Sequence, residues 1–345
     1  MVRVGVIGTT SWGTMLAVLL ARRGVSVTLW ARTPVERDLL ERDRENRRLL
    51  EGTPFPADLA VSADPAEALE GAEAIILAVP SKRLRENLRL VRDALPSRTV
   101  LVSAVKGLER SSGKRMTELI HEELPEGSKE SVCVLSGPNL SGEISRGTPS
   151  STVVASHDLD VAEWVRDIFN STTFRVYTSE DIVGVELGGA LKNAVAIGAG
   201  VSDGLGYGAN AKAAFVTRGL AEITRLGVAA GAVPLTLAGL SGLGDLVATS
   251  FSELSRNRYV GEQLGMGRTL LDVVAEMRHV AEGIDTSAAA LVLAARLGVE
   301  MPIIETTAHI LFDGMDPQEA TTTLLNRAPG QEWPRELVRG QSNTA

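Results

Sequence analysis

Cysteine is almost absent from the sequence, since Cys133 is the only one among 345 residues. One thiol cannot form a disulfide within the chain, and no set of cysteines and histidines has the spacing of a zinc site. We therefore expect a fold that depends on its hydrophobic core, no resident metal, and a reducing, cytoplasmic location.

Positive charge is also in deficit, with a net charge of −8 and an isoelectric point near 5.3. Such a chain lacks the positive field that general nucleic-acid binding requires, so no nucleic-acid partner is expected. A local group of arginines, Arg42, Arg44, Arg47 and Arg48, alternates with acidic residues, which is typical of a solvated helix face.

The sequence is not expected to contain a membrane span. The first residues, MVRVGVIG, are too short for a cleavable signal and lead directly into a glycine turn. Residues 226–244 are uncharged over about the length of a span, but they contain Pro234 and five glycines. We expect a buried bend there and no membrane span.

The first half of the chain alternates strand-like and helix-like segments. Residues 3–7 predict a strand, the turn from Gly8 to Gly13 leads into a helix up to about residue 23, and residues 25–30 predict a second strand. A dinucleotide-binding turn has this place, where backbone N–H groups bind a pyrophosphate. Thr10 stands where the middle glycine is usual. Its Cβ crowds that surface, so we expect a displaced turn or weaker cofactor binding.

The end of the second strand indicates which cofactor binds. An acidic residue there favours NAD, whereas an arginine accommodates the 2′-phosphate of NADP. The sequence has Arg32 at this place and no carboxylate before Glu36. NADP is therefore favoured over NAD, although Arg32 could instead stack on the adenine.

Further apolar runs predict strands at residues 74–79, 99–105, 132–135, 151–155 and 173–177. The carboxyl ends of parallel strands share one crevice, and ligands bind there. Lys106 follows one of these strands, so we expect it to face the crevice. The alternative is a surface lysine before the turn residue Gly107.

After residue 178 the periodicity is almost wholly helical, with helices predicted near residues 211–230, 269–277, 286–297 and 317–325. The fold class is therefore α/β: a Rossmann-type, doubly wound, mostly parallel sheet plus a separate all-helical C-terminal domain. We expect a dinucleotide-binding domain at residues 1–178, a helical substrate-binding domain at residues 179–327, and a mobile tail at residues 328–345.

Residues 185–201, VELGGALKNAVAIGAGV, predict a buried helix at the centre of this arrangement. Lys192 is the residue in it that needs an explanation. On one interpretation it lies at the edge of a core helix and extends its ammonium into water. On the other it faces the crevice that Lys106 and the Gly8 turn share.

Two polar turns complete the pattern. Asp245 follows a glycine-rich turn, and Arg256 and Asn257 come shortly after it. The guanidinium and the amide could bind a small phosphorylated substrate. Asp245 and Arg256 could equally form a structural ion pair.

These segments together resemble the bacterial NAD(P)-dependent sn-glycerol-3-phosphate dehydrogenases over residues 1–327. The resemblance is carried by SWGT from Ser11, LWAR from Leu29, AVKGL from Ala104, LSGP from Leu135, VELGGALKN from Val185, TRGLAEITRLG from Thr217, GLGDLVAT from Gly242, SRNR from Ser255 and VAEG from Val280. It implies a homodimer that reduces dihydroxyacetone phosphate to sn-glycerol 3-phosphate for phospholipid synthesis.

The resemblance also implies roles for individual residues, with Lys192 as the general acid/base. The implied substrate contacts are Lys106, Gly137, Asn139, Asp245, Ser255, Arg256 and Asn257. The implied cofactor contacts are Gly8, Ser11, Trp12, Gly13, Arg32, Lys106, Ser141, Arg256, Val280 and Glu282. At residues 139–141 the chain has Asn-Leu-Ser where Ser-Phe-Ala is common, which makes an expected hydroxyl contact an amide contact.

Two other interpretations compete with this one. The chain could be a reductase of the 6-phosphogluconate or 3-hydroxyacid dehydrogenase type, although the SRNR and VAEG segments argue against it. It could also be a catalytically silent, nucleotide-binding sensor, since Thr10 departs from the motif. The presence of both Lys106 and Lys192 argues against a silent protein.

Overall fold

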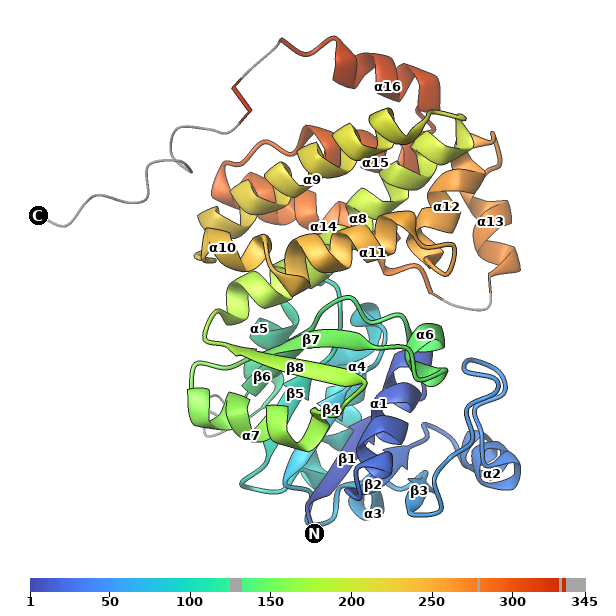
Figure 1. Cartoon of the computed structure of the whole chain (residues 1–345), viewed down its shortest axis with the longest axis vertical. Helices are drawn as coiled ribbons and strands as arrows, with labels where there is room; N and C mark the ends of the chain where they lie inside the picture. The colour runs from blue at the N-terminus through green and yellow to red at the C-terminus, as the bar shows by residue number, and fades with distance from the viewer. Residues whose placement is uncertain (125–131, 278–279, 329–330, 333–345) are drawn as a thin grey trace, which may run out of the picture.

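The structure, a computed structural model, describes residues 1–124, 132–277, 280–328 and 331–332. Its two lobes lie one above the other, with the sheet in the lower lobe and helices in the upper lobe (Figure 1). The tail expected at residues 328–345 lies almost wholly outside the described residues.

An eight-stranded sheet forms the centre of the lower lobe, in the order β3-β2-β1-β4-β5-β6-β7-β8. The strands are β1 (Arg3–Ile7), β2 (Ser26–Trp30), β3 (Leu59–Ser62), β4 (Ala74–Leu77), β5 (Val100–Ser103), β6 (Val132–Ser136), β7 (Ser150–Ala155) and β8 (Phe174–Ser179). All neighbouring strands are parallel except β6 and β7. The predicted fold class is confirmed. The edge strand β3 was not predicted, because its run LAVS is short and poorer in β-branched residues than the runs around the other strands.

Helices cover both faces of the sheet, as the alternation of side chains along the strands requires. In β4, Ile76 packs with α1 (Ser11–Arg22), α6 (Ser141–Ser145) and α7 (Leu159–Phe169). Ile75 and Leu77 instead pack with α3 (Pro65–Leu69), α4 (Leu84–Val91) and α5 (Met116–Glu123). The two apolar layers cover both faces of the sheet and leave its carboxyl edge for polar residues.

The arginines at residues 42–48 do not form a helix face, so that prediction is wrong. Helix α2 (Pro34–Asp43) ends before most of them, and Arg44 takes the left-handed conformation with φ of 47°. Its guanidinium donates to the carbonyls of Pro56 and Leu59. Arg44 is therefore a helix-end residue that fixes the following loop.

The upper lobe is built around α8 (Ile182–Gly204), whose residues are buried along most of its length. Around it lie α9 (Ala209–Ala229), α10 (Pro234–Leu237), the π-turn η4 (Leu240–Gly244), α11 (Asp245–Phe251), α12 (Arg256–Gly265), α13 (Leu270–Glu276), α14 (Glu282–Leu297), α15 (Pro302–Phe312) and α16 (Pro317–Leu325). Helix α8 is long and apolar enough to cross a membrane, but 94% of its apolar window is buried inside the protein. It has the burial of a core helix.

The predicted bend at residues 226–244 is present, divided between the end of α9, α10 and η4. It is only partly buried: Leu237 is covered, whereas Leu235 is 79% exposed. Gly231, with φ of 98°, makes the turn out of α9.

The two lobes meet through buried polar contacts as well as apolar ones. Glu186, in the first turns of α8, accepts hydrogen bonds from the backbone N–H of Thr117 (2.8 Å), from its hydroxyl (2.7 Å) and from Arg115 (3.0 Å). Burial raises the pKa of Glu186, while Arg115 and the Thr117 donors lower it. The start of α8 is thus fixed to the start of α5.

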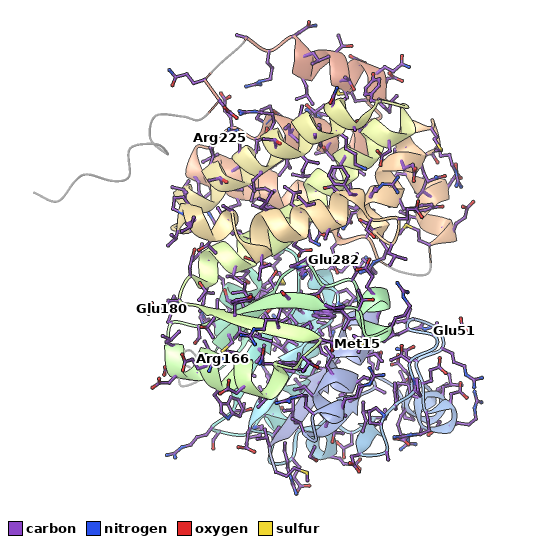
Figure 2. The ribbon with its side chains drawn as sticks, in the orientation of Figure 1. Met15, Glu51, Arg166, Glu180, Arg225 and Glu282 are labelled. Atoms are coloured by element: carbon purple, nitrogen blue, oxygen red, sulfur yellow. The ribbon has the colours of Figure 1, made fainter. Side chains whose placement is uncertain are left out.

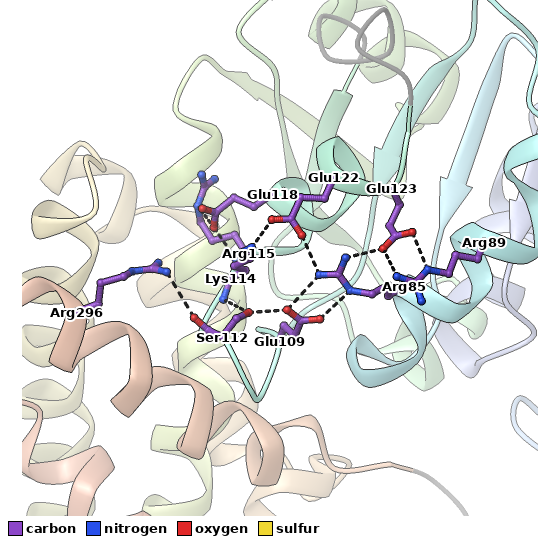
Figure 3. A network of polar contacts seen from close by, with 10 residues as sticks. All are labelled: Arg85, Arg89, Glu109, Ser112, Lys114, Arg115, Glu118, Glu122, Glu123 and Arg296. Atoms are coloured by element: carbon purple, nitrogen blue, oxygen red, sulfur yellow. Dashed lines mark hydrogen bonds and ion pairs between the residues drawn. The ribbon is translucent and has the colours of Figure 1, made fainter.

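A network of ion pairs holds the loop that follows β5 (Figure 3). Arg85 of α4 lies at its centre and contacts Glu109 (2.9 Å), Glu122 (2.9 Å) and Glu123 (2.5 Å). Ser112 in the same loop donates to Glu109 at 2.5 Å. The loop that begins just after β5 is thereby fixed against α4 and α5.

Candidate active site

A cleft of about 1440 Å³ lies along the carboxyl edge of the sheet and below the helical lobe. Most of the residues that the sequence predicted for a site line it: Gly8, Ser11, Trp12, Arg32, Lys106, Asn139, Ser141, Lys192, Ser255, Arg256, Asn257, Val280 and Glu282. Gly13, Gly137 and Asp245 do not line it, and each contacts a residue that does. The fold thus brings distant segments of both lobes to one cavity.

The turn between β1 and α1 has the backbone that a dinucleotide requires. Gly8 has φ of 119°, and a Cβ on Gly13 would lie 2.0 Å from the Gly8 carbonyl oxygen. Helix α1 has no acidic residue in its first turn, so the positive end of its dipole is not neutralised there. These features fit a bound pyrophosphate.

Thr10 fits into this turn as a helix cap. Its hydroxyl accepts a hydrogen bond from the Gly13 N–H (3.0 Å) and donates to the carbonyl of Ala78 (2.7 Å). The side chain is therefore directed toward the end of β4 and the first turn of α1. Its polar group satisfies a backbone donor that a glycine would leave without a partner.

The corner of the cleft beyond β2 contains both signs of charge. The guanidinium of Arg32 pairs with Glu86, and both side chains are more than 40% exposed. Glu36 accepts hydrogen bonds from the Thr9 hydroxyl (2.6 Å) and from the backbone N–H of Arg32 (3.2 Å). The sequence singled out Arg32 but assigned no role to Glu36.

At the centre of the site, Asp245 lies between two lysines. Its Oδ2 accepts from Lys106 Nζ at 2.7 Å, and its Oδ1 accepts from Lys192 Nζ at 2.8 Å. Lys192 also donates to the Thr249 hydroxyl (2.6 Å), and Lys106 donates to the Gly137 carbonyl (2.7 Å). The cluster joins the end of β5, the middle of α8 and the start of α11.

Burial and the neighbouring charges shift the pKa values of Lys192 and Asp245. Lys192 is 6% exposed and Asp245 is 2% exposed, so the interpretation of Lys192 as a lysine extending into water is wrong. Burial lowers the pKa of Lys192 to about 8, because Lys106 adds to the desolvation and Asp245 offsets only part of it. Burial alone would raise the pKa of Asp245, but the two ammonium groups hold it below its ordinary value. A lysine in this state can exchange its proton near neutral pH.

The second polar turn lies at the start of α12. Asn257 donates to the side chain of Asn193 (2.8 Å) and accepts from the Gly283 N–H (2.9 Å). Asn193 in turn donates to the backbone carbonyl of Lys106 (3.2 Å). These amides connect α8, α12 and α14 to the strand that precedes Lys106. The sequence predicted Asn257 but not Asn193 or Thr249.

Arg256 lines the cleft without a partner of its own. In the part of the chain that the structure describes, no carboxylate lies within ion-pairing distance of its guanidinium, and Asp245 is bonded to the lysines instead. The alternative of a structural Asp245–Arg256 pair is therefore wrong. Glu282 acts on this guanidinium electrostatically, but its carboxylate bonds Ser81. A guanidinium that forms no ion pair in a cleft is suited to bind an anion.

Other predicted site residues have structural partners. The Asn139 amide donates to the Ser151 carbonyl (3.1 Å), and its oxygen accepts from Thr152 (3.0 Å), both on β7. Ser255 caps α12 by accepting from the Arg258 N–H (3.2 Å). A substrate contact by either side chain stays a prediction.

Glu282 links the two lobes at the roof of the cleft (Figure 2). Its carboxylate accepts hydrogen bonds from the backbone N–H and the hydroxyl of Ser81, which follows β4. Burial raises the pKa of Glu282, which the Ser81 donors and the nearby Arg256 lower. Val280 lies beside it in the cleft wall.

Comparison with known proteins gives a consistent result over the chain. The family model described as NAD-dependent glycerol-3-phosphate dehydrogenase N-terminus matches residues 3–162, and the corresponding C-terminus model matches residues 181–322. A protein of Chlorobium phaeobacteroides (strain BS1), named glycerol-3-phosphate dehydrogenase (NAD(P)+), is 48% identical over 96% of this chain and 99% of its own. A relative of the same name from Dehalococcoides mccartyi (strain CBDB1) is 45% identical over 96% of this chain and 94% of its own.

Solved structures agree with the sequence comparisons. A crystal structure of glycerol-3-phosphate dehydrogenase from Coxiella burnetii is similar to this chain, with a TM-score of 0.90 and 35% sequence identity. The similarity covers 94% of this chain and 99% of the Coxiella chain.

The charge cluster predicts a large effect of Asp245→Asn on stability. The substitution leaves the buried ammonium of Lys192 beside that of Lys106 without a carboxylate, so we expect the free energy of unfolding to fall by about 3 kcal/mol. Urea titration measures it. Asp38→Asn is the control, because Asp38 pairs with Arg37 on the surface and should change stability by less than about 0.5 kcal/mol. Equal losses in both variants would contradict an ionic role for Asp245.

Proposed function

The chain belongs to the NAD-dependent glycerol-3-phosphate dehydrogenase family, and from that premise we propose that it interconverts dihydroxyacetone phosphate and sn-glycerol 3-phosphate. The observation that carries the proposal is the arrangement of Lys192 and the unpaired Arg256 in one cleft with the Gly8 turn. The family match favours this activity over that of a 6-phosphogluconate or 3-hydroxyacid dehydrogenase.

Lys192 is proposed as the general acid/base. Bound NAD(P)H supplies a hydride to C2 of the ketone, and the oxygen at that carbon then needs a proton. Lys192 donates this proton in reduction and accepts it in oxidation. Its lowered pKa supports the role, since transfer is most efficient when the pKa of the group is near the working pH.

Lys106 and Asp245 are proposed to prepare Lys192 for that transfer. Asp245 fixes the position of both ammonium groups through its two oxygens. Lys106 contributes to the lowered pKa of Lys192 by repulsion, and its ammonium can polarise the substrate carbonyl. Gly137, which accepts from Lys106, keeps that side chain in the cleft.

The substrate phosphate is proposed to bind at the start of α12. Arg256 forms no ion pair among the described residues, and Asn257 and Ser255 lie next to it at the positive end of the helix dipole. Binding energy from this remote group would hold the carbonyl beside Lys192. Asn139 and Gly137 are the proposed contacts on the side of the sheet.

The cofactor is proposed to lie along the Gly8 turn, against Ser11, Trp12 and Ser141, and to reach the roof formed by Val280 and Glu282. NADP is favoured over NAD because Arg32 can exchange Glu86 for the 2′-phosphate, and an ion pair as exposed as this one contributes little.

The wider setting is proposed on the same basis. Residues 1–178 and 179–327 are proposed as the two domains, and the chain is proposed to act in the cytoplasm as a homodimer. Its product would serve as a precursor of glycerophospholipids.

The assay that tests the proposed reaction follows the absorbance of NADPH, and separately of NADH, after addition of dihydroxyacetone phosphate. We expect oxidation of both nucleotides, with the higher kcat/KM for NADPH. Turnover of 3-hydroxyacids but not of glycerol 3-phosphate would contradict the proposed substrate. Nucleotide binding without any turnover would indicate a silent sensor instead.

Removing the proposed acid/base should abolish most of the turnover. Lys192→Ala is expected to lower kcat by at least about 100-fold, the lower range for loss of general acid/base catalysis. Lys82→Ala is the matched control, because Lys82 is an exposed lysine of the same lobe as Lys106 and should leave kcat unchanged. Near-normal turnover of Lys192→Ala would exclude its role.

The pKa of Lys192 sets the pH dependence. With a pKa of about 8 in the free enzyme, the protonated form needed for reduction is lost above that pH. We expect kcat/KM for reduction to fall above about pH 8 and kcat/KM for oxidation to rise up to that pH. Profiles in both directions measure it. Parallel changes in the two directions would show that another group controls the rate.

A further inference from the structure

A second charge cluster lies deeper in the helical lobe and takes no part in the proposed chemistry. Asp203, at the end of α8, accepts on one oxygen, Oδ2, from Lys212 Nζ of α9 (2.7 Å) and from Arg258 Nε of α12 (2.6 Å). Arg258 also contacts Glu262 at 3.2 Å. Lys212 is 7% exposed. Two cations and two carboxylates thus balance in a partly buried place.

The position of Asp203 on α8 relates it to the active site. It lies three helical turns beyond Lys192 on the same face, about 16 Å along the axis. Lys192 bonds Asp245 and Thr249 of α11 from that face, and Asp203 bonds Arg258 at the start of α12. The segment from α11 to α12 is therefore fixed to α8 near both of its ends.

Lys212 adds a contact at the end of α11. Its ammonium lies over the ring of Phe251, 4.6 Å from the ring centre. Phe251 is the last residue of α11 and is 47% exposed. The cluster thus contacts residues on both flanks of the loop at residues 252–255. Phe251 comes directly before this loop, and Arg258 comes three residues after it.

That loop has little else to hold it. Among the described residues, the hydrogen bonds of residues 252–255 all stay between residues 248 and 259. Leu254 and Ser255 form part of the cleft wall, and Arg256 follows them directly. Asn257 is held from the other side by Asn193 and Gly283. The orientation of Arg256 in the cleft therefore depends on these bonds and on how the two ends of the loop are fixed.

The packing of α12 on α8 leaves no room for a compensating shift. A Cβ on Gly261 would lie 1.8 Å from the Ile197 carbonyl oxygen, and one on Gly200 would lie 2.0 Å from the Arg258 carbonyl oxygen. The backbones of the two helices are therefore in direct contact just below Arg258. Small changes at Arg258 should move the turn at Arg256, since the rest of α12 cannot absorb them.

We propose that Asp203, Lys212 and Arg258 are positioning residues for the anion-binding turn at Arg256 and Asn257. The carboxylate of Asp203 holds the loop at residues 252–255 from both sides, through Arg258 directly and through Lys212 and Phe251. The network sets the affinity for the phosphate group of the substrate and does not touch the reacting atoms. This proposal rests on the proposed function of the cleft.

The test distinguishes an effect on binding of the substrate phosphate from an effect on reaction at the substrate carbonyl. Lys212→Met keeps most of the side-chain volume but removes the charge. We expect it to raise KM for dihydroxyacetone phosphate by about 10- to 100-fold, the range for a misplaced binding group, with a much smaller fall in kcat. The kcat/KM for dihydroxyacetone, which has no phosphate, should not change. Calorimetry with sn-glycerol 3-phosphate, without turnover, should show the same loss of affinity.

Two further variants keep the test decisive. Phe251→Leu removes only the cation–π contact at an exposed side chain, so it should fold and raise KM by about threefold. Lys212→Arg retains a cation and should keep most of the wild-type affinity for dihydroxyacetone phosphate, which Lys212→Met loses. Glu222→Gln is the control for general loss of stability, because Glu222 is a buried carboxylate that binds the N–H groups of Ile303 and Ile304 outside the cleft. It should leave both KM values unchanged.

The outcomes distinguish a failure of the positioning role from a failure of the proposed function. An unchanged KM in Lys212→Met and Phe251→Leu, or equal losses with the phosphorylated and the phosphate-free substrate, would overturn the positioning role. A wild-type protein that neither turns over dihydroxyacetone phosphate nor binds sn-glycerol 3-phosphate would overturn the proposed function, and the network's role with it.

Discussion

The structure depends most on one buried carboxylate held between two ammonium groups. Asp245 bonds Lys106 at the carboxyl end of β5 and Lys192 in the middle of α8. Without this charge the buried ammonium of Lys192 would have no counter-ion, which is costly. The cluster therefore fixes the sheet lobe and the helical lobe in one relation, and the cleft between them follows from it.

The surrounding structure supports each member of the cluster separately. The ion pairs of Arg85 hold Glu109, three residues after Lys106 in the loop that follows β5 (Figure 3). Glu186 fixes the start of α8 through Thr117 and Arg115. Asn193, one residue beyond Lys192, connects the backbone of Lys106 to Asn257. The polar groups of the site are thus held by bonds to backbone as well as to each other.

Much of the fold could be predicted from the sequence, because the strands of a parallel sheet are buried on both faces and read as continuous apolar runs. Strand β3 and helices α12 and α15 were missed, since short or mixed segments carry weak periodicity. Most of the residues that line the cleft could also be predicted, because the carboxyl ends of parallel strands meet at one edge of the sheet. The environment of Lys192 could not, since only tertiary contacts decide whether a helix lysine reaches water.

Pairing between distant side chains was the part that sequence could not supply. Asp245 and Arg256 are close in sequence, yet Asp245 bonds two distant lysines, and Arg256 forms no ion pair with any residue that the structure describes. Thr10 departs from the glycine of the motif but acts as a cap for α1. Asp203 and Lys212 gave no signal at all, because nothing in their neighbouring residues distinguishes a buried ion pair from a solvated one.

The most direct test of the cluster of Asp245, Lys106 and Lys192 is the titration of Lys192 itself. NMR of protein labelled with 13C at the lysine side-chain ε carbon follows each ammonium group through pH, and comparison with Lys192→Arg assigns the resonance. We expect a pKa of about 8 for this lysine. A value near that of a solvated lysine, about 10.4, would contradict it.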